Sequence, residues 1–101
     1  MIIYNVTTRV AWAIHEIWLQ WMQDEHIPSV LGTGCFEKHQ FVKLLEIDEE
    51  DGPTYAVQYF ASSIEKYNQY ISQYSTIFRQ EVLKKWNNQT IAFHSLMEVV
   101  N

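Results

Sequence analysis

The sequence contains few of the residues on which disulfide, metal or nucleic-acid chemistry depends. Cys35 is its only cysteine, which excludes an intramolecular disulfide, a CxxC pair and a four-cysteine zinc site. Only 7 Lys and Arg residues stand against 12 Asp and Glu residues, for a net charge of -5. No basic stripe of the kind that binds phosphate backbones is present. We therefore expect a reducing compartment, a structural role for Cys35 and no nucleic-acid partner.

Long hydrophobic runs and short catalytic motifs are also missing. Residues 1–7 carry no basic region ahead of their apolar side chains, and no apolar stretch is long enough for a signal peptide or a membrane span. We expect a cytoplasmic protein with no membrane partner. The sequence has no glycine-rich phosphate loop, no serine or cysteine nucleophile signature and no HExxH helix. No cofactor is predicted, and the sequence leaves open whether the protein is an enzyme.

Apolar and aromatic residues, in contrast, are abundant. Hydrophobic residues make up 48% of the 101 residues, which is enough for one compact domain over residues 1–101, and the chain is too short for two. Four Trp and six Tyr are more large side chains than one small interior covers. We expect some of them to serve an interface.

The first part of the chain predicts a strand followed by a helix. Residues 2–8 are mostly β-branched or aromatic, which favours a strand. From about Val10 the apolar residues follow the i, i+3, i+4, i+7, i+8 spacing of an amphipathic helix. The residues of this stripe are Ile14, Ile17, Trp18, Trp21 and Met22.

A proline and two glycines follow this helix. Pro28 disfavours helical geometry at Ile27, but it can occupy the first turn of a new short helix over residues 29–31. Gly32 or Gly34 is then expected to end that helix.

The middle of the chain predicts a hairpin. Apolar residues return with strand-like spacing over residues 35–47. An acidic run over residues 46–51 leads into Asp51-Gly52-Pro53, a turn signal, and a second strand follows over residues 54–61. The acidic run lacks the spacing of a calcium loop, so we expect a solvated hairpin tip.

The last part predicts one long helix and a final strand. Residues 62–65 form a capping-box pattern that opens a helical stripe continuing to Trp86. Tyr74 and Phe78 lie on this stripe, so we expect both to be buried against the sheet. Two asparagines end the helix, and residues 91–100 alternate as a strand.

The resulting order is βαββαβ, which is the ferredoxin-like arrangement of the α+β class, a four-stranded antiparallel sheet with two helices on one face. The helices cover only one face, yet the predicted strands carry large apolar residues on both parities. A second copy of the chain would cover the open face, so we expect a homodimer. We expect Gln58, Ser95 and His94 to line a wet cavity between the two sheets.

Several segments together resemble a small bacterial family of unknown function, over the whole chain. That family in turn resembles the dimeric α+β barrel superfamily, in which two ferredoxin-like protomers pack sheet against sheet. The resemblance implies the fold and the dimer, and superfamily members include cofactor-free monooxygenases, haem-degrading enzymes, isomerases and ligand-binding proteins. The segments are Met-Ile-Ile-Tyr-Asn-Val-Thr at the start, Trp18 to Met22, His26-Ile27-Pro28, Gly34 to Phe36, and Tyr55-Ala56-Val57-Gln58-Tyr59.

His26, just beyond the first helix, is the candidate catalytic residue. An imidazole there could act as a proton donor or acceptor near neutral pH, and the resemblance supports this role, because in several superfamily relatives a histidine near this corner is a catalytic candidate. The alternative is a structural histidine whose ring bonds a backbone carbonyl and fixes the turn before Pro28.

The candidate ligand-binding residues are Tyr4, Trp18, His39, Tyr55, Tyr59 and His94. The two histidines lie in predicted strands and, on one face, could polarise a ligand together with the tyrosines. Trp18 lies on the buried stripe and is typical of a core residue, although it could also form a wall for a planar molecule. No metal site is predicted, because no third ligand stands at a suitable spacing. His15 is most simply a surface residue.

Three functions follow from these observations. The first is a homodimer that holds a small apolar or aromatic molecule in a sheet-lined cavity. The second is a cofactor-free monooxygenase or isomerase with His26 as acid or base. The third is a structural or protein-interaction dimer without a ligand.

Overall fold

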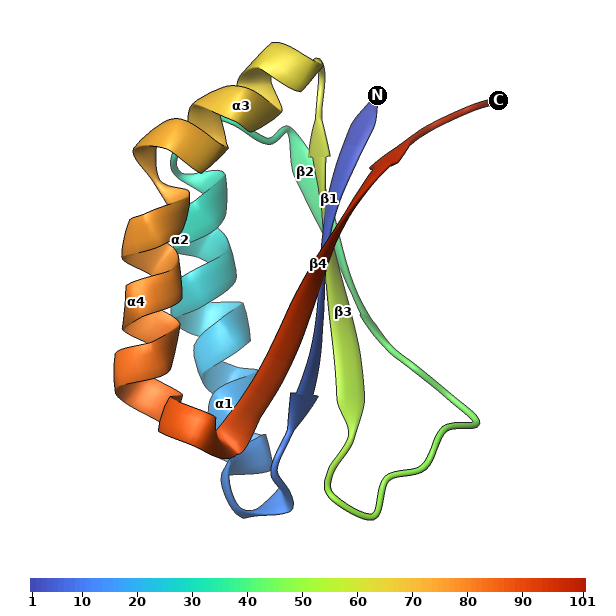
Figure 1. Ribbon diagram of the computed structural model, residues 1–101, viewed down its shortest axis with the longest axis vertical. Helices are drawn as coiled ribbons and strands as arrows, with labels where there is room; N and C mark the ends of the chain where they lie inside the picture. Colours follow the sequence, from blue (N-terminus) through green and yellow to red (C-terminus); the bar gives the residue numbers. More distant parts are fainter.

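A computed structural model describes residues 1–101 as one antiparallel sheet with a layer of helices on one face (Figure 1). The strands are β1 (Ile2–Val10), β2 (Lys38–Lys43), β3 (Thr54–Ala61) and β4 (Thr90–Glu98), in the spatial order β2-β3-β1-β4. Each neighbouring pair is antiparallel. The predicted α+β class and its ferredoxin-like sheet are therefore confirmed.

The segment after β1 is helical from Trp12 to Leu31 and changes pitch along its length. A 3₁₀ turn, η1 (Trp12–Ile14), leads into α1 (His15–Trp21), then into η2 (Met22–His26), which is a π-helical turn, and finally into α2 (Ile27–Leu31). The predicted interruption at Ile27 is wrong, since that residue has helical angles of φ -60 and ψ -46. A proline ring collides with the carbonyl four residues earlier in an α-helix, and the wide π turn just before Pro28 relieves that collision.

The β2–β3 hairpin is shorter on one side than predicted. β3 has the predicted bounds, whereas β2 begins at Lys38 and ends at Lys43, inside the predicted residues 35–47; Glu46 beyond it adopts φ 58, where the chain turns. Leu45 and Ile47 are therefore exposed in the loop, not paired in a strand. Gly52 adopts φ +140, and a Cβ there would lie 1.8 Å from the carbonyl oxygen of Val10. The loop can approach the end of β1 only with glycine at this position.

The predicted long helix is two helices, α3 (Ile64–Gln73) and α4 (Ser75–Trp86), separated at Tyr74 with φ -128. The hydroxyl of Ser75 donates to the carbonyl of Ile71 at 2.8 Å, a bond that bends helices. The N-cap of α3 is Ser63, whose hydroxyl accepts from the backbone N–H of Lys66. The predicted capping box over residues 62–65 is therefore wrong, because the N-cap is one residue later and the third helical residue is then a lysine, which cannot accept a bond in return. The helix ends where predicted, at Asn87 with φ 53, and a 3₁₀ turn, η3 (Asn87–Gln89), leads into β4.

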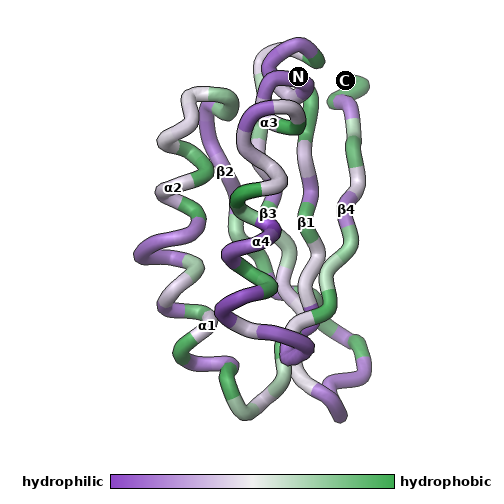
Figure 2. The backbone as a smooth tube through the Cα atoms, turned by 60° about the vertical axis from the view of Figure 1, so that its left-hand side comes forward, coloured by the Kyte–Doolittle hydropathy of each residue, from purple (hydrophilic) through white to green (hydrophobic).

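The α1–α2 and α3–α4 segments run side by side over one face of the sheet (Figure 2). The strand register places Tyr4, Tyr59 and Leu96 in one row on this face. His94 belongs to the same face, so its predicted place between two sheets is wrong, whereas Gln58 and Ser95 lie on the other face. Tyr74 and Phe78 of the helical layer are half-buried, less than predicted.

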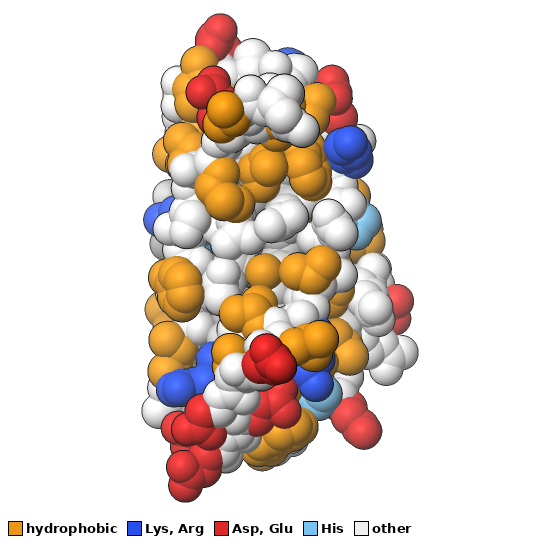
Figure 3. All heavy atoms as spheres, turned by 90° about the vertical axis from the view of Figure 1, so that its right-hand side faces the viewer, with side chains coloured by type: hydrophobic (Ala, Val, Ile, Leu, Met, Phe, Trp, Pro, Cys, Tyr) orange, Lys and Arg blue, Asp and Glu red, His pale blue; other side chains and the backbone are white.

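The opposite face of the sheet is uncovered, and apolar side chains gather on it around a polar centre (Figure 3). Ile91, Phe93 and Met97 of β4 point to this side, and Phe93 is 62% exposed. Asn5 and Thr7 of β1 lie at its centre and are hydrogen-bonded to each other at 2.9 Å. No helix in the structure has the length and apolar character needed to cross a bilayer.

Candidate functional site

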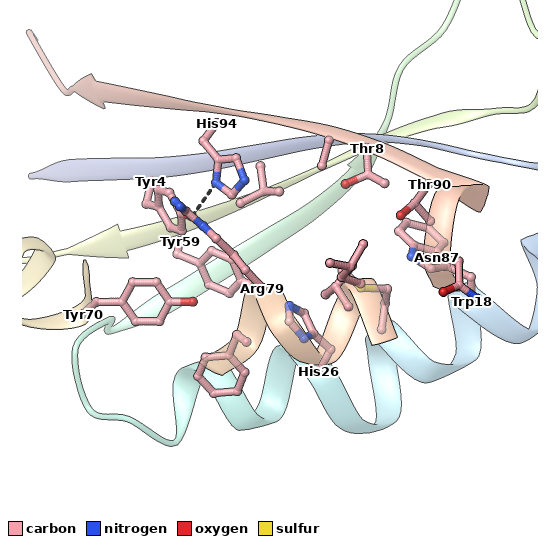
Figure 4. Close-up of a pocket in the computed structure, with 16 residues that line it drawn as sticks. Tyr4, Thr8, Trp18, His26, Tyr59, Tyr70, Arg79, Asn87, Thr90 and His94 are labelled. Atoms are coloured by element: carbon pink, nitrogen blue, oxygen red, sulfur yellow. Dashed lines mark hydrogen bonds between the residues drawn. The ribbon is translucent and has the colours of Figure 1, made fainter. Parts of the chain in front are cut away.

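A cavity of about 240 Å³ lies between the sheet and the helical layer (Figure 4). Its floor comes from β1, β3 and β4, and its walls come from α1, η2, α3 and α4. Most of the lining is apolar, and no Asp or Glu contributes to it. The aromatic and polar lining residues are Tyr4, Thr8, Trp18, His26, Tyr59, Tyr70, Arg79, Asn87, Thr90 and His94.

His26 is the last residue of the π turn and points into the cavity (Figure 4). Its ring stacks on Trp21 with centroids 4.9 Å apart and meets the edge of Phe78 at 5.7 Å. Nδ1 is buried without a hydrogen-bond partner, so the predicted alternative of a bond from the ring to a backbone carbonyl is not found. Burial lowers the pKa of His26 to about 4, because the charged imidazolium would lose its hydration. The ring is neutral at pH 7.

Tyr4 and His94 form a hydrogen-bonded pair across β1 and β4, between the phenol oxygen and Nδ1. Burial raises the pKa of Tyr4, and the positive charge of Arg79 acts against that effect. Burial, followed by the charge of Arg79, lowers the pKa of His94. Both partners are therefore neutral near pH 7. With the Tyr4 hydroxyl donating to Nδ1, the proton of the His94 ring is carried by Nε2.

Two further tyrosines complete the aromatic end of the cavity. Tyr59 projects from β3 and Tyr70 from α3, and Phe36 lies against both, with centroids at 5.2 and 5.0 Å. Burial raises the pKa of each phenol, so each hydroxyl keeps its proton. The hydroxyl of Tyr59 is buried and has no hydrogen-bond partner. It is an unused donor and acceptor at the edge of the cavity.

Trp18 forms the wall at the other end and is 2% exposed. It comes from α1, and its indole packs on Tyr55 with centroids 5.5 Å apart. Thr8, Asn87 and Thr90 lie at this end of the cavity in Figure 4. Trp18 thus belongs both to the core and to the cavity wall.

Two of the residues singled out from the sequence lie outside the cavity. His39 is on the helix-facing side of β2, opposite Tyr59, but it is exposed at the edge of the sheet. Tyr55 is buried under Trp18, and its hydroxyl is hydrogen-bonded to Nε2 of His15 at 2.7 Å. His15 is consequently half-buried and engaged, not a free surface residue as predicted.

Arg79, Tyr70 and Asn87 line the cavity and were not predicted from the sequence. Arg79 lies four residues after Ser75 and seven before Trp86, both of which are buried on the inward side of α4. That spacing is the sequence signal that could have placed Arg79 on the inward face of the helix, since residues i and i+4 share a helix face. No cluster of three or more His, Cys, Asp or Glu residues is arranged to hold a metal ion.

Comparison with known proteins identifies a family of unknown function and solved structures that share the fold. A family model described as a domain of unknown function (DUF4286) matches residues 1–100. No curated protein matches the sequence significantly.

Solved structures with this fold are distant in sequence. A dimeric ferredoxin-like protein from an uncultured marine organism has a TM-score of 0.68 at 18% identity, with 100% of this chain and 96% of that chain covered. A second such protein has a TM-score of 0.67 at 11% identity, with 99% and 95% covered. SnoaB, a cofactor-independent oxygenase from Streptomyces nogalater, has a TM-score of 0.65 at 12% identity, with 99% and 93% covered. At these identities the similarity establishes the ferredoxin-like fold and no more.

Proposed function

Because the chain belongs to the DUF4286 family, a domain of unknown function, we propose a function from the cavity itself: a homodimer that binds a small aromatic or apolar molecule between sheet and helices. The observation that carries this proposal is an apolar cavity whose lining residues include two with a buried polar atom that has no protein partner, Nδ1 of His26 and the hydroxyl of Tyr59. A buried polar atom without a partner costs about 1–3 kcal/mol, and a ligand that bonds to it recovers that cost.

The size of the cavity indicates the size of the ligand. An engineered cavity of about 150 Å³ holds benzene. At about 240 Å³ this cavity has room for one ring with substituents or for two fused rings. Trp18 and Tyr70 supply flat faces against which such a ring can pack.

The proposed dimer forms through the open face of the sheet. Ile91, Phe93 and Met97 are apolar and exposed there, and monomeric proteins rarely leave such a group in water. Two similar structures are described as dimeric ferredoxin-like proteins. A specific interface buries about 1,200–2,000 Å² in total. The single, buried Cys35 fits the reducing cytoplasm in which we propose that the protein works.

A second candidate function is cofactor-free oxygenation or isomerisation with His26 as the base. It is favoured by the free Nδ1 of a neutral imidazole inside the cavity, and by the fold shared with SnoaB, which is described as a cofactor-independent oxygenase. A base whose conjugate acid has a pKa of about 4 removes protons efficiently only from acidic enols or phenols. Because few substrates meet this requirement, we propose binding as the first function and catalysis as the second.

Ligand-observed NMR with a panel of aromatic acids, aromatic amides, quinones and haem tests the binding proposal. Val82→Phe, on the cavity side of α4, is expected to abolish binding by filling the cavity. Ile77→Phe, an exposed position on the same helix, is the matched control and is expected to bind as wild type does. Equal binding by the Val82 variant would place the ligand elsewhere. No binding by any panel member would favour the third function, a structural or protein-interaction dimer.

Oxygen uptake and product analysis with bound panel members separate the second candidate from the first. Turnover that is lost in His26→Phe while binding persists would identify a catalytic role for His26. Binding without turnover in wild type would leave the protein as a binding module.

A further inference from the structure

Arg79 is the only charged side chain among the residues that line the cavity. It comes from α4 and extends toward Tyr4 and His94 on the sheet (Figure 4). Its position affects its neighbours, because its positive charge bears on the ionisation of Tyr4, Tyr70 and His94. Arg79 is itself exposed to solvent, so its guanidinium is a part of the cavity wall that water also reaches.

No carboxylate of the protein neutralises this cation. The two ion pairs of the chain are Arg9–Asp51 and Lys43–Glu49, and both lie away from the cavity. The chain carries 12 acidic residues against 7 basic ones, so acidic side chains are not scarce, and yet none of them pairs with Arg79. The cavity nevertheless combines one arginine with no acid, two neutral histidines and three protonated tyrosines. Its charge is positive in a protein whose net charge is negative.

We propose that the natural ligand of the cavity is a one- or two-ring aromatic carboxylate, whose anionic group pairs with Arg79 while its ring lies among Trp18, Met22 and Val82. This inference rests on the proposed binding function and adds the charge and class of the ligand. A guanidinium presents two parallel N–H donors, which match the two oxygens of a carboxylate. The Tyr4 hydroxyl, beside Arg79, is already bonded to His94, so the arginine is the charged donor at this end.

The test compares acids with amides of the same shape: benzoate with benzamide, and 1-naphthoate with 1-naphthamide. Each is titrated against wild type, Arg79→Met and Lys84→Met, with tryptophan fluorescence and ligand-observed NMR as readouts. Lys84 is an exposed residue of α4 outside the cavity, so its variant removes the same charge from the same helix. Circular dichroism melts verify that each variant is folded.

We expect wild type to bind the better-fitting acid at least about tenfold more tightly than its amide, as a charge-assisted bond predicts. Arg79→Met should reduce acid affinity to that of the amide and leave amide affinity within about twofold, while Lys84→Met should keep the preference. If wild type binds the amides as tightly as the acids, or Arg79→Met keeps the preference, the anionic ligand is refuted and the binding function stands. If neither acids nor amides bind, the anionic ligand is refuted, and the binding function falls with it if the quinones and haem of the wider panel do not bind either.

Discussion

Phe93→Glu is expected to dissociate the proposed dimer without unfolding the protomer. Phe93 lies on the uncovered face of the sheet, on strand β4, with 62% of its surface exposed. Little of its side chain is packed within the protomer, so a substitution there removes few intramolecular contacts. In a two-fold symmetric dimer the change occurs twice in one interface.

The expected loss follows from this exposed fraction. Complete burial of a phenylalanine side chain is worth about 1.5–3 kcal/mol. The 62% that remains exposed in the protomer therefore represents about 1–2 kcal/mol per copy, or about 2–4 kcal/mol for the pair. That loss corresponds to a rise in the dimer dissociation constant of roughly thirty- to a thousandfold. Burial of two carboxylates would add to it.

Sedimentation equilibrium at micromolar concentrations measures the dissociation constant, and thermal melting by circular dichroism measures folding. Ile77→Glu is the control, because Ile77 is similarly exposed, at 55%, but belongs to the helical layer. Its variant should remain as dimeric as wild type. A wild-type protein that is monomeric, or a Phe93 variant that dimerises as tightly as wild type, would refute packing through the open sheet face.

Three further variants test the packing and the cavity. Gly52→Ala should cost at least about 2 kcal/mol in urea denaturation, because a positive φ is strained for alanine and its Cβ would lie 1.8 Å from the Val10 carbonyl oxygen; a neutral variant would mean that the hairpin loop moves freely. The pKa of His26 is about 4 in the folded chain against 6.5 when unfolded, so the unfolded chain takes up the proton first as the pH falls. Stability should be insensitive to this group above about pH 6.5 and should fall by at most about 3 kcal/mol between pH 6.5 and 4. Urea denaturation across this range should show a shallower slope for His26→Phe, and an unchanged slope would contradict the buried neutral imidazole. Trp18→Ala should cost about 3–5 kcal/mol, whereas Phe78→Ala, half-buried beside an existing cavity, should cost about 2 kcal/mol; the reverse order would show that the two side chains have been assigned to the wrong environments.

The sheet could be predicted because its strands are delimited by local chemistry. β3 has the predicted bounds, since Asp51-Gly52-Pro53 precedes it and two serines follow it. β2 was predicted too long, because alternating apolar residues continue to Ile47 although the chain leaves the sheet at Lys43. The division between α3 and α4 at Tyr74 carries no glycine or proline, so the helical stripe gave no sign of it.

The cavity depends on facts that a single sequence does not contain. The sheet order places β2 and β4 at opposite edges, so His39 and His94 share a face and still lie far apart. Arg79 was overlooked because a charge on a helix usually faces water. Tyr4, Tyr59 and Trp18 were found because large residues on inward positions line whatever space remains between the layers.

The π-helical turn at Met22–His26 makes the wall of the cavity depend on the number of residues in this segment as well as on their identity. Buried positions recur every four residues from Ile14 through Trp18 to Met22, and the next, Ile27, follows after five. Deletion of one residue here would restore an ordinary α-helix and rotate the preceding or following side chains by about 100°. No substitution is equivalent to such a change. Chains in which this segment is one residue shorter would therefore present a different side chain to the cavity, even if every other residue were identical.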